Sequence, residues 1–133
     1  MERVFVDTSA LLALGLRDDD RHKEARRIFE GVLDAGTPCW TSSYVLVEHI
    51  SLLHRRAGTV PLRKFAEGIL PLMTVVWVEP SIHEEALRRL LKSVGRGISF
   101  VDATSFLLLK AEPGSSVFAF DSDFEKEGFR VLR

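Results

Sequence analysis

Short apolar runs alternate along this chain with longer segments of helical periodicity. The apolar runs are of strand length and cover residues 4–7, 39–40, 73–78, 117–120 and 129–132. Val4-Phe5-Val6 has no polar alternation, which is typical of a strand buried on both faces of a parallel sheet. Strands that alternate with helices predict an α/β fold with a central, mainly parallel sheet flanked by helices.

The helices between these runs are predicted from their capping residues and their apolar stripes. Thr8 or Ser9 is expected to cap the first helix, Asp18-Asp19-Asp20 to open the second, and Ser42 or Ser43 to cap the third. Ser81 and Glu84 have the spacing of a capping box. The later helices are predicted over residues 61–71, 81–94, 100–110 and, as a turn or short helix, 122–127.

Carboxylates follow two of the predicted strands. Asp7 closes the first apolar run and Asp121 closes the run 117–120. Because binding sites in open α/β sheets lie beyond the carboxyl ends of the strands, both side chains are expected at one site. Glu48 interrupts an apolar helix, where it is predicted to be buried, and Asp102 begins another helix. Buried carboxylates need a partner, and a cluster of hard oxygen ligands favours Mg²⁺ or Mn²⁺.

Each of these acids also has a purely structural interpretation. Asp is common before helices, but Thr8 or Ser9 can cap the first helix, which leaves Asp7 free to bind a ligand. Ser99-x-x-Asp102 approximates a capping box, so Asp102 by itself is ambiguous. Asp121 and Asp123, which lie between aromatic residues, can hold either a cation or a turn.

Composition restricts the possible class of protein. The 133 residues suit one domain over 1–133, and a formal net charge of −1 argues against wrap-around binding of nucleic acid. A local basic patch remains open, although charged residues on helices usually form a solvated face. Its candidates are Arg55, Arg56, Arg88, Arg89, Lys92 and Arg96.

The remaining sequence signals predict a cytoplasmic protein with no membrane span. Cys39 is the only cysteine, which excludes an internal disulfide and fits a reducing compartment. The N-terminus leads directly into the first strand and shows no signal peptide. The chain also lacks a zinc-binding helix, a glycine-rich phosphate loop and a nucleophile elbow.

Taken together, these motifs resemble the PIN-domain family of ribonucleases over nearly the whole chain. The matching pieces are Val6-Asp7-Thr8-Ser9, Glu48, Ser99-Phe100-Val101-Asp102-Ala103 and Phe120-Asp121-Ser122-Asp123-Phe124. Their order and spacing, with the length of the chain, look like the toxins of VapBC toxin–antitoxin modules. One departure is Ala119-Phe120, where many relatives have a Thr before the last acidic pair.

The resemblance implies a Mg²⁺-dependent endoribonuclease. By carry-over, Asp7, Glu48, Asp102 and Asp121 would form the acidic site, Asp123 would be an accessory metal ligand, and Thr8 would match the hydroxyl residue after the first acid. It also implies an RNA substrate, a cognate antitoxin and a two-fold homodimer. A housekeeping PIN nuclease and a non-catalytic RNA-binding or assembly module remain as alternatives. A receiver domain or a dehalogenase-like phosphatase is disfavoured because a single Asp follows the first strand.

Overall fold

The computed structural model describes residues 2–95 and 97–133, so Arg96 of the candidate basic patch lies outside the described residues. The strands are β1 (Arg3–Val6), β2 (Cys39–Ser42), β3 (Met73–Val76) and β4 (Ser115–Phe118). The helices are α1 (Thr8–Gly15), α2 (His22–Asp34), α3 (Ser43–Ala57), α4 (Thr59–Gly68), the 3₁₀ turn η1 (Leu70–Leu72), α5 (Pro80–Lys92), α6 (Phe100–Lys110) and α7 (Asp123–Lys126).

The four strands form one parallel sheet in the order β3-β2-β1-β4. The chain moves outward from β1 to β3 and then returns to place β4 on the other side of β1. The strand order therefore reverses between β1 and β4, which is where ligands bind in open α/β sheets. Asp7 follows β1 directly, and its backbone N–H donates to the carbonyl of Phe118 at the end of β4 (3.0 Å).

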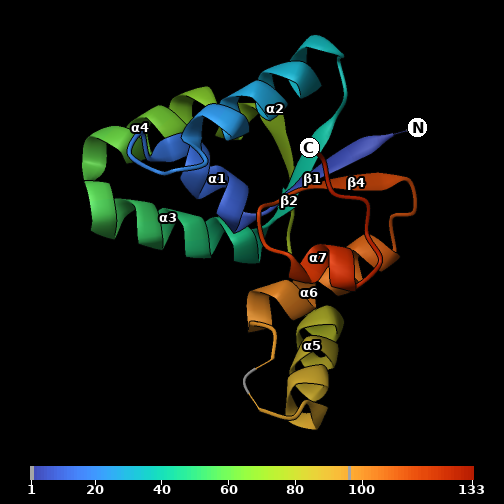
Figure 1. Cartoon of the computed structure of the whole chain (residues 1–133). Helices are drawn as coiled ribbons and strands as arrows, with labels where there is room; N and C mark the ends of the chain where they lie inside the picture. Colours follow the sequence, from blue (N-terminus) through green and yellow to red (C-terminus); the bar gives the residue numbers. More distant parts are fainter. Residues whose placement is uncertain (1, 96) are drawn as a thin grey trace.

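Helices cover both faces of this sheet, as predicted (Figure 1). The central strands are buried, because each is covered on both faces, and their largest enclosed side chains come from β1, β2 and β4 and from the helices packed on them. These side chains include Phe5, Trp40, Phe106, Phe118 and Phe124. Phe5 packs edge-on against Trp40, with ring centroids 4.8 Å apart. The packed core therefore fixes the position of the end of β1 relative to the end of β4.

Several predicted boundaries were wrong, including that of β4, which spans Ser115–Phe118 and not 117–120. Helix α2 begins at His22, because Asp19 accepts the backbone N–H of Arg21 in a turn that precedes the helix. Helix α5 begins at Pro80, so Ser81 lies inside it and forms no cap. Residues 129–132 form only an isolated bridge from Val131 to Val117, because their pairing with β4 stops after one residue.

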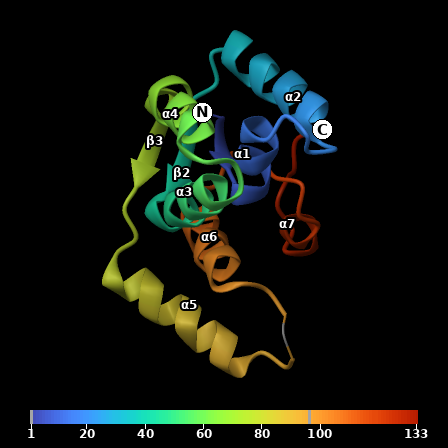
Figure 2. The ribbon, with the colours of Figure 1, turned by 90° about the vertical axis from the view of Figure 1, so that its left-hand side faces the viewer.

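Helix α5 stands apart from the main body and packs chiefly on α6 (Figures 1 and 2). Arg89 fixes it by an ion pair with Glu127 and by stacking over Phe106. Leu91 and Val94 at its end are 76% and 96% exposed, so the predicted apolar stripe of this helix faces outward there. Among the described residues, no helix is long and apolar enough to span a membrane.

Candidate metal centre

Asp7 lies at the junction between β1 and α1. Contrary to the sequence prediction, Asp7 itself caps α1, because its Oδ2 accepts the backbone N–H and the hydroxyl of Ser9 (3.2 and 2.7 Å). Its Oδ1 is buried and has no hydrogen-bond partner among the described residues. One oxygen of Asp7 therefore holds the start of the helix, and the other remains available to a ligand.

Ser9 connects the two strand ends that frame the site. Its hydroxyl donates to Asp7 and accepts the backbone N–H of Phe120 (3.0 Å). Phe120 immediately precedes Asp121, so Ser9 ties the loop that carries Asp121 to the end of β1. In the sequence, Ser9 was a possible helix cap and part of the Val6-Asp7-Thr8-Ser9 motif, and neither indicated this second contact.

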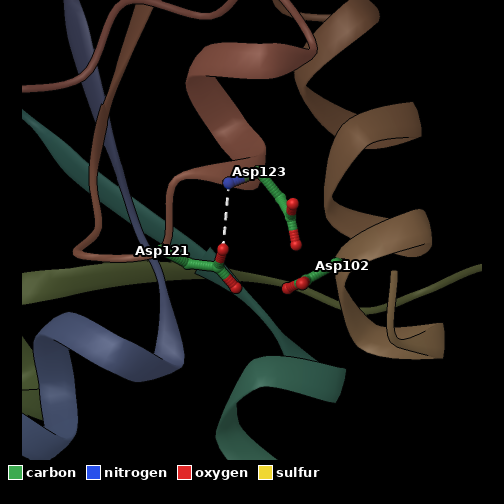
Figure 3. A group of neighbouring side chains, drawn as sticks. All are labelled: Asp102, Asp121 and Asp123. Carbon is green, nitrogen blue, oxygen red and sulfur yellow. Dashed lines mark hydrogen bonds between the residues drawn. The ribbon is translucent and has the colours of Figure 1, made fainter. Parts of the chain in front are cut away.

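Asp102, Asp121 and Asp123 converge from two separate segments (Figure 3). One carboxylate oxygen from each lies within 4.8 Å of the other two. Ser99 caps α6 through the backbone N–H of Asp102 (3.0 Å), which leaves the Asp102 side chain directed at the other two acids. Asp121 Oδ1 accepts the backbone N–H of Asp123 (2.9 Å), and this turn brings both side chains to one side.

Burial, together with the charge of the neighbouring carboxylates, raises the pKa of Asp102 and Asp7. Burial raises the pKa of Asp102 to about 7, and the charges of Asp7, Asp121, Glu48 and Asp123 contribute further. Burial raises the pKa of Asp7 to about 6, while its hydrogen bonds to Ser9 act in the opposite direction. Carboxyl groups that repel one another in this way are stabilised by a bound cation.

Glu48 lies near this cluster but is less buried than predicted. It is half-buried, whereas its neighbour His49 is fully buried. Glu48 raises the pKa of both Asp7 and Asp102, so its charge acts on the site. Neither Glu48 nor Asp7 belongs to the group of three whose oxygens lie within 4.8 Å. The structure therefore places Asp123 more centrally than the sequence suggested, with Glu48 and Asp7 next to the group.

The donor set fits a hard divalent cation. Every candidate ligand is an oxygen atom, and Mg²⁺ and Mn²⁺ prefer carboxylate oxygens to nitrogen or sulfur. Buried Oδ1 of Asp7 and buried Oγ1 of Thr8 both lack a partner among the described residues. Such buried polar atoms are costly unless a ligand or water binds them. The residues present therefore suit a divalent metal.

The chain belongs to the PIN domain family, whose model matches residues 4–129. It is 38% identical to the 23S rRNA-specific endonuclease VapC20 of Mycobacterium tuberculosis, in an alignment that covers 98% of each chain. The same identity and coverage hold for VapC20 of both the CDC 1551 and H37Rv strains.

Solved structures agree with this assignment. The crystal structure of M. tuberculosis VapC20, described as a sarcin-ricin loop cleaving toxin, superimposes with a TM-score of 0.80 over 95% of each chain at 36% identity. A protein from Pyrobaculum aerophilum matches with a TM-score of 0.60 over 98% of this chain and 88% of its own, at 18% identity, and shows the fold alone.

Proposed function

We propose that this chain is a metal-dependent endoribonuclease and the toxin of a toxin–antitoxin module. The proposal rests on the convergence of Asp102, Asp121 and Asp123 beside Asp7, in a chain similar throughout its length to an RNA endonuclease toxin. The five acids Asp7, Glu48, Asp102, Asp121 and Asp123 would hold Mg²⁺, for which Mn²⁺ can substitute. Residues 1–133 would act as one domain in the cytoplasm, where RNA is accessible.

Each side chain has a distinct part in this proposal. Asp102 and Asp121 would bind the cation most directly, and Asp7 would contribute its unpaired Oδ1. Thr8, whose hydroxyl is buried beside Asp7, would donate to an oxygen of the bound phosphate or of an ordered water. When bound, the cation supplies an activated water and offsets charge on the phosphate. Hydrolysis by water would leave a 5′-phosphate and a 3′-hydroxyl.

The substrate we propose is ribosomal RNA of the large subunit. VapC20 is named for 23S rRNA and its structure for the sarcin-ricin loop. Proteins that recognise RNA by sequence mostly bind single-stranded loops, so the choice of cleavage site would depend on the shape of an exposed RNA loop.

The decisive experiment is incubation of the pure chain with intact ribosomes and with unrelated structured RNAs. We expect cleavage at one site of the large rRNA in millimolar Mg²⁺ or Mn²⁺, and none in excess chelator. Mapping the ends would test the expected 5′-phosphate. Cleavage that survives exhaustive chelation would contradict the metal proposal. Specific binding without cleavage would favour a non-catalytic RNA-binding module instead.

This chain has a surface suited to docking of the proposed antitoxin. A groove of about 530 Å³ between α1, α2 and α4 has apolar walls that include Leu14, Phe29 and Ile69. Arg17, Arg26 and Lys64 also line it, as do Asp18 and Glu30. Glu30 pairs with Arg26, whereas Arg17 and Lys64 form no ion pair among the described residues. An amphipathic helix with acidic residues on its polar face would fit this surface, and a basic residue of the same partner would pair with the acidic site. Expression of the chain alone should slow growth, and co-expression of the partner should restore it.

We also propose a homodimer, although on a different surface from the one predicted. The sequence favours the helix 61–72 together with the apolar helix before it. There Phe65 is only 2% exposed and Leu62 and Ile69 are partly buried, whereas Leu72 and Val47 are 47% and 65% exposed. Exposed apolar residues also lie on α5 and on either side of it, and these form the surface that we propose: Trp77, Leu87, Leu91 and Val94. Light scattering should give twice the monomer mass, and Leu91→Glu should shift it toward the monomer.

A further inference from the structure

A second cavity opens beside Asp121, on the side of the acidic site that faces α1 and the end of α3. It has a volume of about 320 Å³ and is lined by Ser9, Leu12, Asp19, Arg21, Arg56, Phe120 and Asp121. Two arginines therefore line one hollow with a proposed metal ligand. Nothing in the proposed acid chemistry uses either arginine.

The position of Arg21 is set by local structure. Asp19 Oδ1 accepts the backbone N–H of Arg21 (2.8 Å), which closes the turn before α2 and directs that carboxylate at the backbone. The Arg21 guanidinium lies over the Phe120 ring, 5.0 Å from its centroid. This stacking is a favourable cation–π contact that leaves the edge of the guanidinium free to donate hydrogen bonds.

Neither guanidinium forms an ion pair with another described residue. Arg3, Arg26, Arg63, Arg89, Arg130 and Arg133 all form ion pairs, whereas Arg21 and Arg56 form none within 4.0 Å among the described residues. Arg21 and Arg56 are also exposed. Unpaired arginines that share a hollow are suited to bind an anion with several oxygens.

An RNA substrate creates a need for such a site. The carboxylates that hold the metal repel every phosphate outside its immediate neighbourhood, and the chain as a whole carries a net charge of −1. Phosphates next to the one being cleaved therefore need cationic partners of their own, because phosphate contacts supply most of the affinity and fix the register of the strand.

We infer that Arg21 and Arg56 form a subsite for the RNA phosphates that flank the cleaved bond, on the Asp121 side of the acidic site. This inference rests on the proposed endoribonuclease function and adds the direction in which the strand leaves the metal. Arg21 and Arg56 are binding and positioning residues, so their loss should raise KM more than it lowers kcat.

The test compares a double variant with a matched control of equal charge. Arg21→Gln/Arg56→Gln removes the pair, and Arg27→Gln/Arg55→Gln removes two arginines outside the cavity, of which Arg55 is the chain neighbour of Arg56. Binding of a labelled single-stranded RNA is measured in Mg²⁺ over a range of salt, with each variant placed in an Asp102→Asn chain to prevent cleavage. Steady-state cleavage is measured separately in the active chain.

For Arg21→Gln/Arg56→Gln we expect affinity to fall about tenfold, and the slope of log K against log salt to fall by about 1.4, since each single-strand phosphate contact contributes about 0.7. The control should keep its slope, and Arg21→Lys/Arg56→Lys should recover it. KM should rise at least about tenfold in the active double variant, with kcat changed less.

Two outcomes would overturn the inference. One is an unchanged salt slope and KM in Arg21→Gln/Arg56→Gln, and the other is an equal loss in the control, which would indicate diffuse electrostatics. Both leave the proposed function standing, because cleavage by the unaltered chain is measured independently. Conversely, failure of the unaltered chain to cleave RNA in metal would reject the function, while the binding assay would still report on the arginines.

Discussion

Two regions of this molecule bury polar side-chain atoms that have no partner among the described residues. In the first, Oδ1 of Asp7 and Oγ1 of Thr8 lie at the carboxyl end of β1. In the second, both ring nitrogens of His49 lie in the contact between α3 and its neighbours. Buried polar atoms of this kind are rare, because each carries an uncompensated desolvation cost.

Their surroundings differ in charge. Burial raises the pKa of Asp7 and of Asp102, and neighbouring carboxylates add to it: Glu48 for Asp7, and all four of the other acids for Asp102. Asp121 and Asp123 are partly open to solvent. His49 is fully enclosed and packs edge-on against Phe65, with ring centroids 4.4 Å apart. Burial lowers the pKa of His49 to about 4, and no neighbouring charge contributes. An unpaired polar atom therefore indicates a ligand site only where like charges gather around it.

The largest expected effect follows from neutralising Asp102. Asp102→Asn should lower RNA cleavage by at least about 100-fold, since even residues that only orient metal ligands cost about 10–100-fold. The same change should stabilise the metal-free protein. A raised pKa means that stability is lost as pH rises through about 7, so the gain should be roughly 1–3 kcal/mol at pH 8 and vanish near pH 4.

Chemical denaturation in chelator at the two pH values measures this gain, and end-labelled RNA measures cleavage. Asp34→Asn, at the exposed end of α2, is the matched control and should change neither quantity. A loss of stability of Asp102→Asn at pH 8 would contradict this prediction. The charge of Asp102 would then stabilise the acidic region and not repel the neighbouring carboxylates, and the comparison with the His49 region would not hold.

The acidic region could largely be predicted from the sequence, and the reason is topological. Asp7 and Asp121 follow apolar runs that form neighbouring parallel strands, and parallel strands end at the same edge. Ser99 caps α6 as expected, which fixes where Asp102 points. Local patterns and one topological rule therefore suffice to bring these acids together.

The His49 region could not be predicted, because the helix that carries it is apolar almost all round. The sequence of such a helix does not show which side faces the core. A buried Glu48 was therefore predicted, whereas the structure buries His49 and leaves Glu48 half-buried. Helix α4 places Phe65 against His49, and this contact determines which side of α3 is buried. The second role of Ser9 was missed for a similar reason, since its contact with Phe120 joins residues 111 positions apart.

A smaller effect is expected at Ser9, which joins the two strand ends of the acidic region. Ser9→Ala removes the hydrogen bonds to Asp7 and from Phe120, so the loop that carries Asp121 should lose its fixed distance from β1. We expect cleavage to fall about 10-fold, with weaker activation by Mg²⁺, as for residues that orient metal ligands. Ser9→Thr, which keeps the hydroxyl, should retain most activity. Metal titration of cleavage would measure both variants, and unchanged activation of Ser9→Ala would leave the hydroxyl with a capping role only.

The last effect, on stability alone, is expected at His49, where the sign with pH is opposite to that of Asp102. A lowered pKa means that the unfolded chain binds a proton that the folded protein excludes, so stability falls as pH drops from about 6.5 toward 4. At pH 5 this costs about 2 kcal/mol, because pH 5 lies about 1.5 pH units below the ordinary histidine pKa of 6.5 and each unit is worth about 1.4 kcal/mol. His49→Phe keeps an aromatic ring against Phe65 and cannot be protonated. Its stability relative to the unaltered chain should therefore rise by about 2 kcal/mol between pH 8 and pH 5. The difference between the two pH values cancels any packing cost of the larger ring.

His54→Phe, at an exposed position of the same helix, should show no such rise. If the two variants had equal pH profiles in denaturant titrations, His49 would have a partner when folded in solution. The difference between the fully buried, unpaired His49 and the acidic site, whose unpaired atoms are available to a ligand, would then no longer hold.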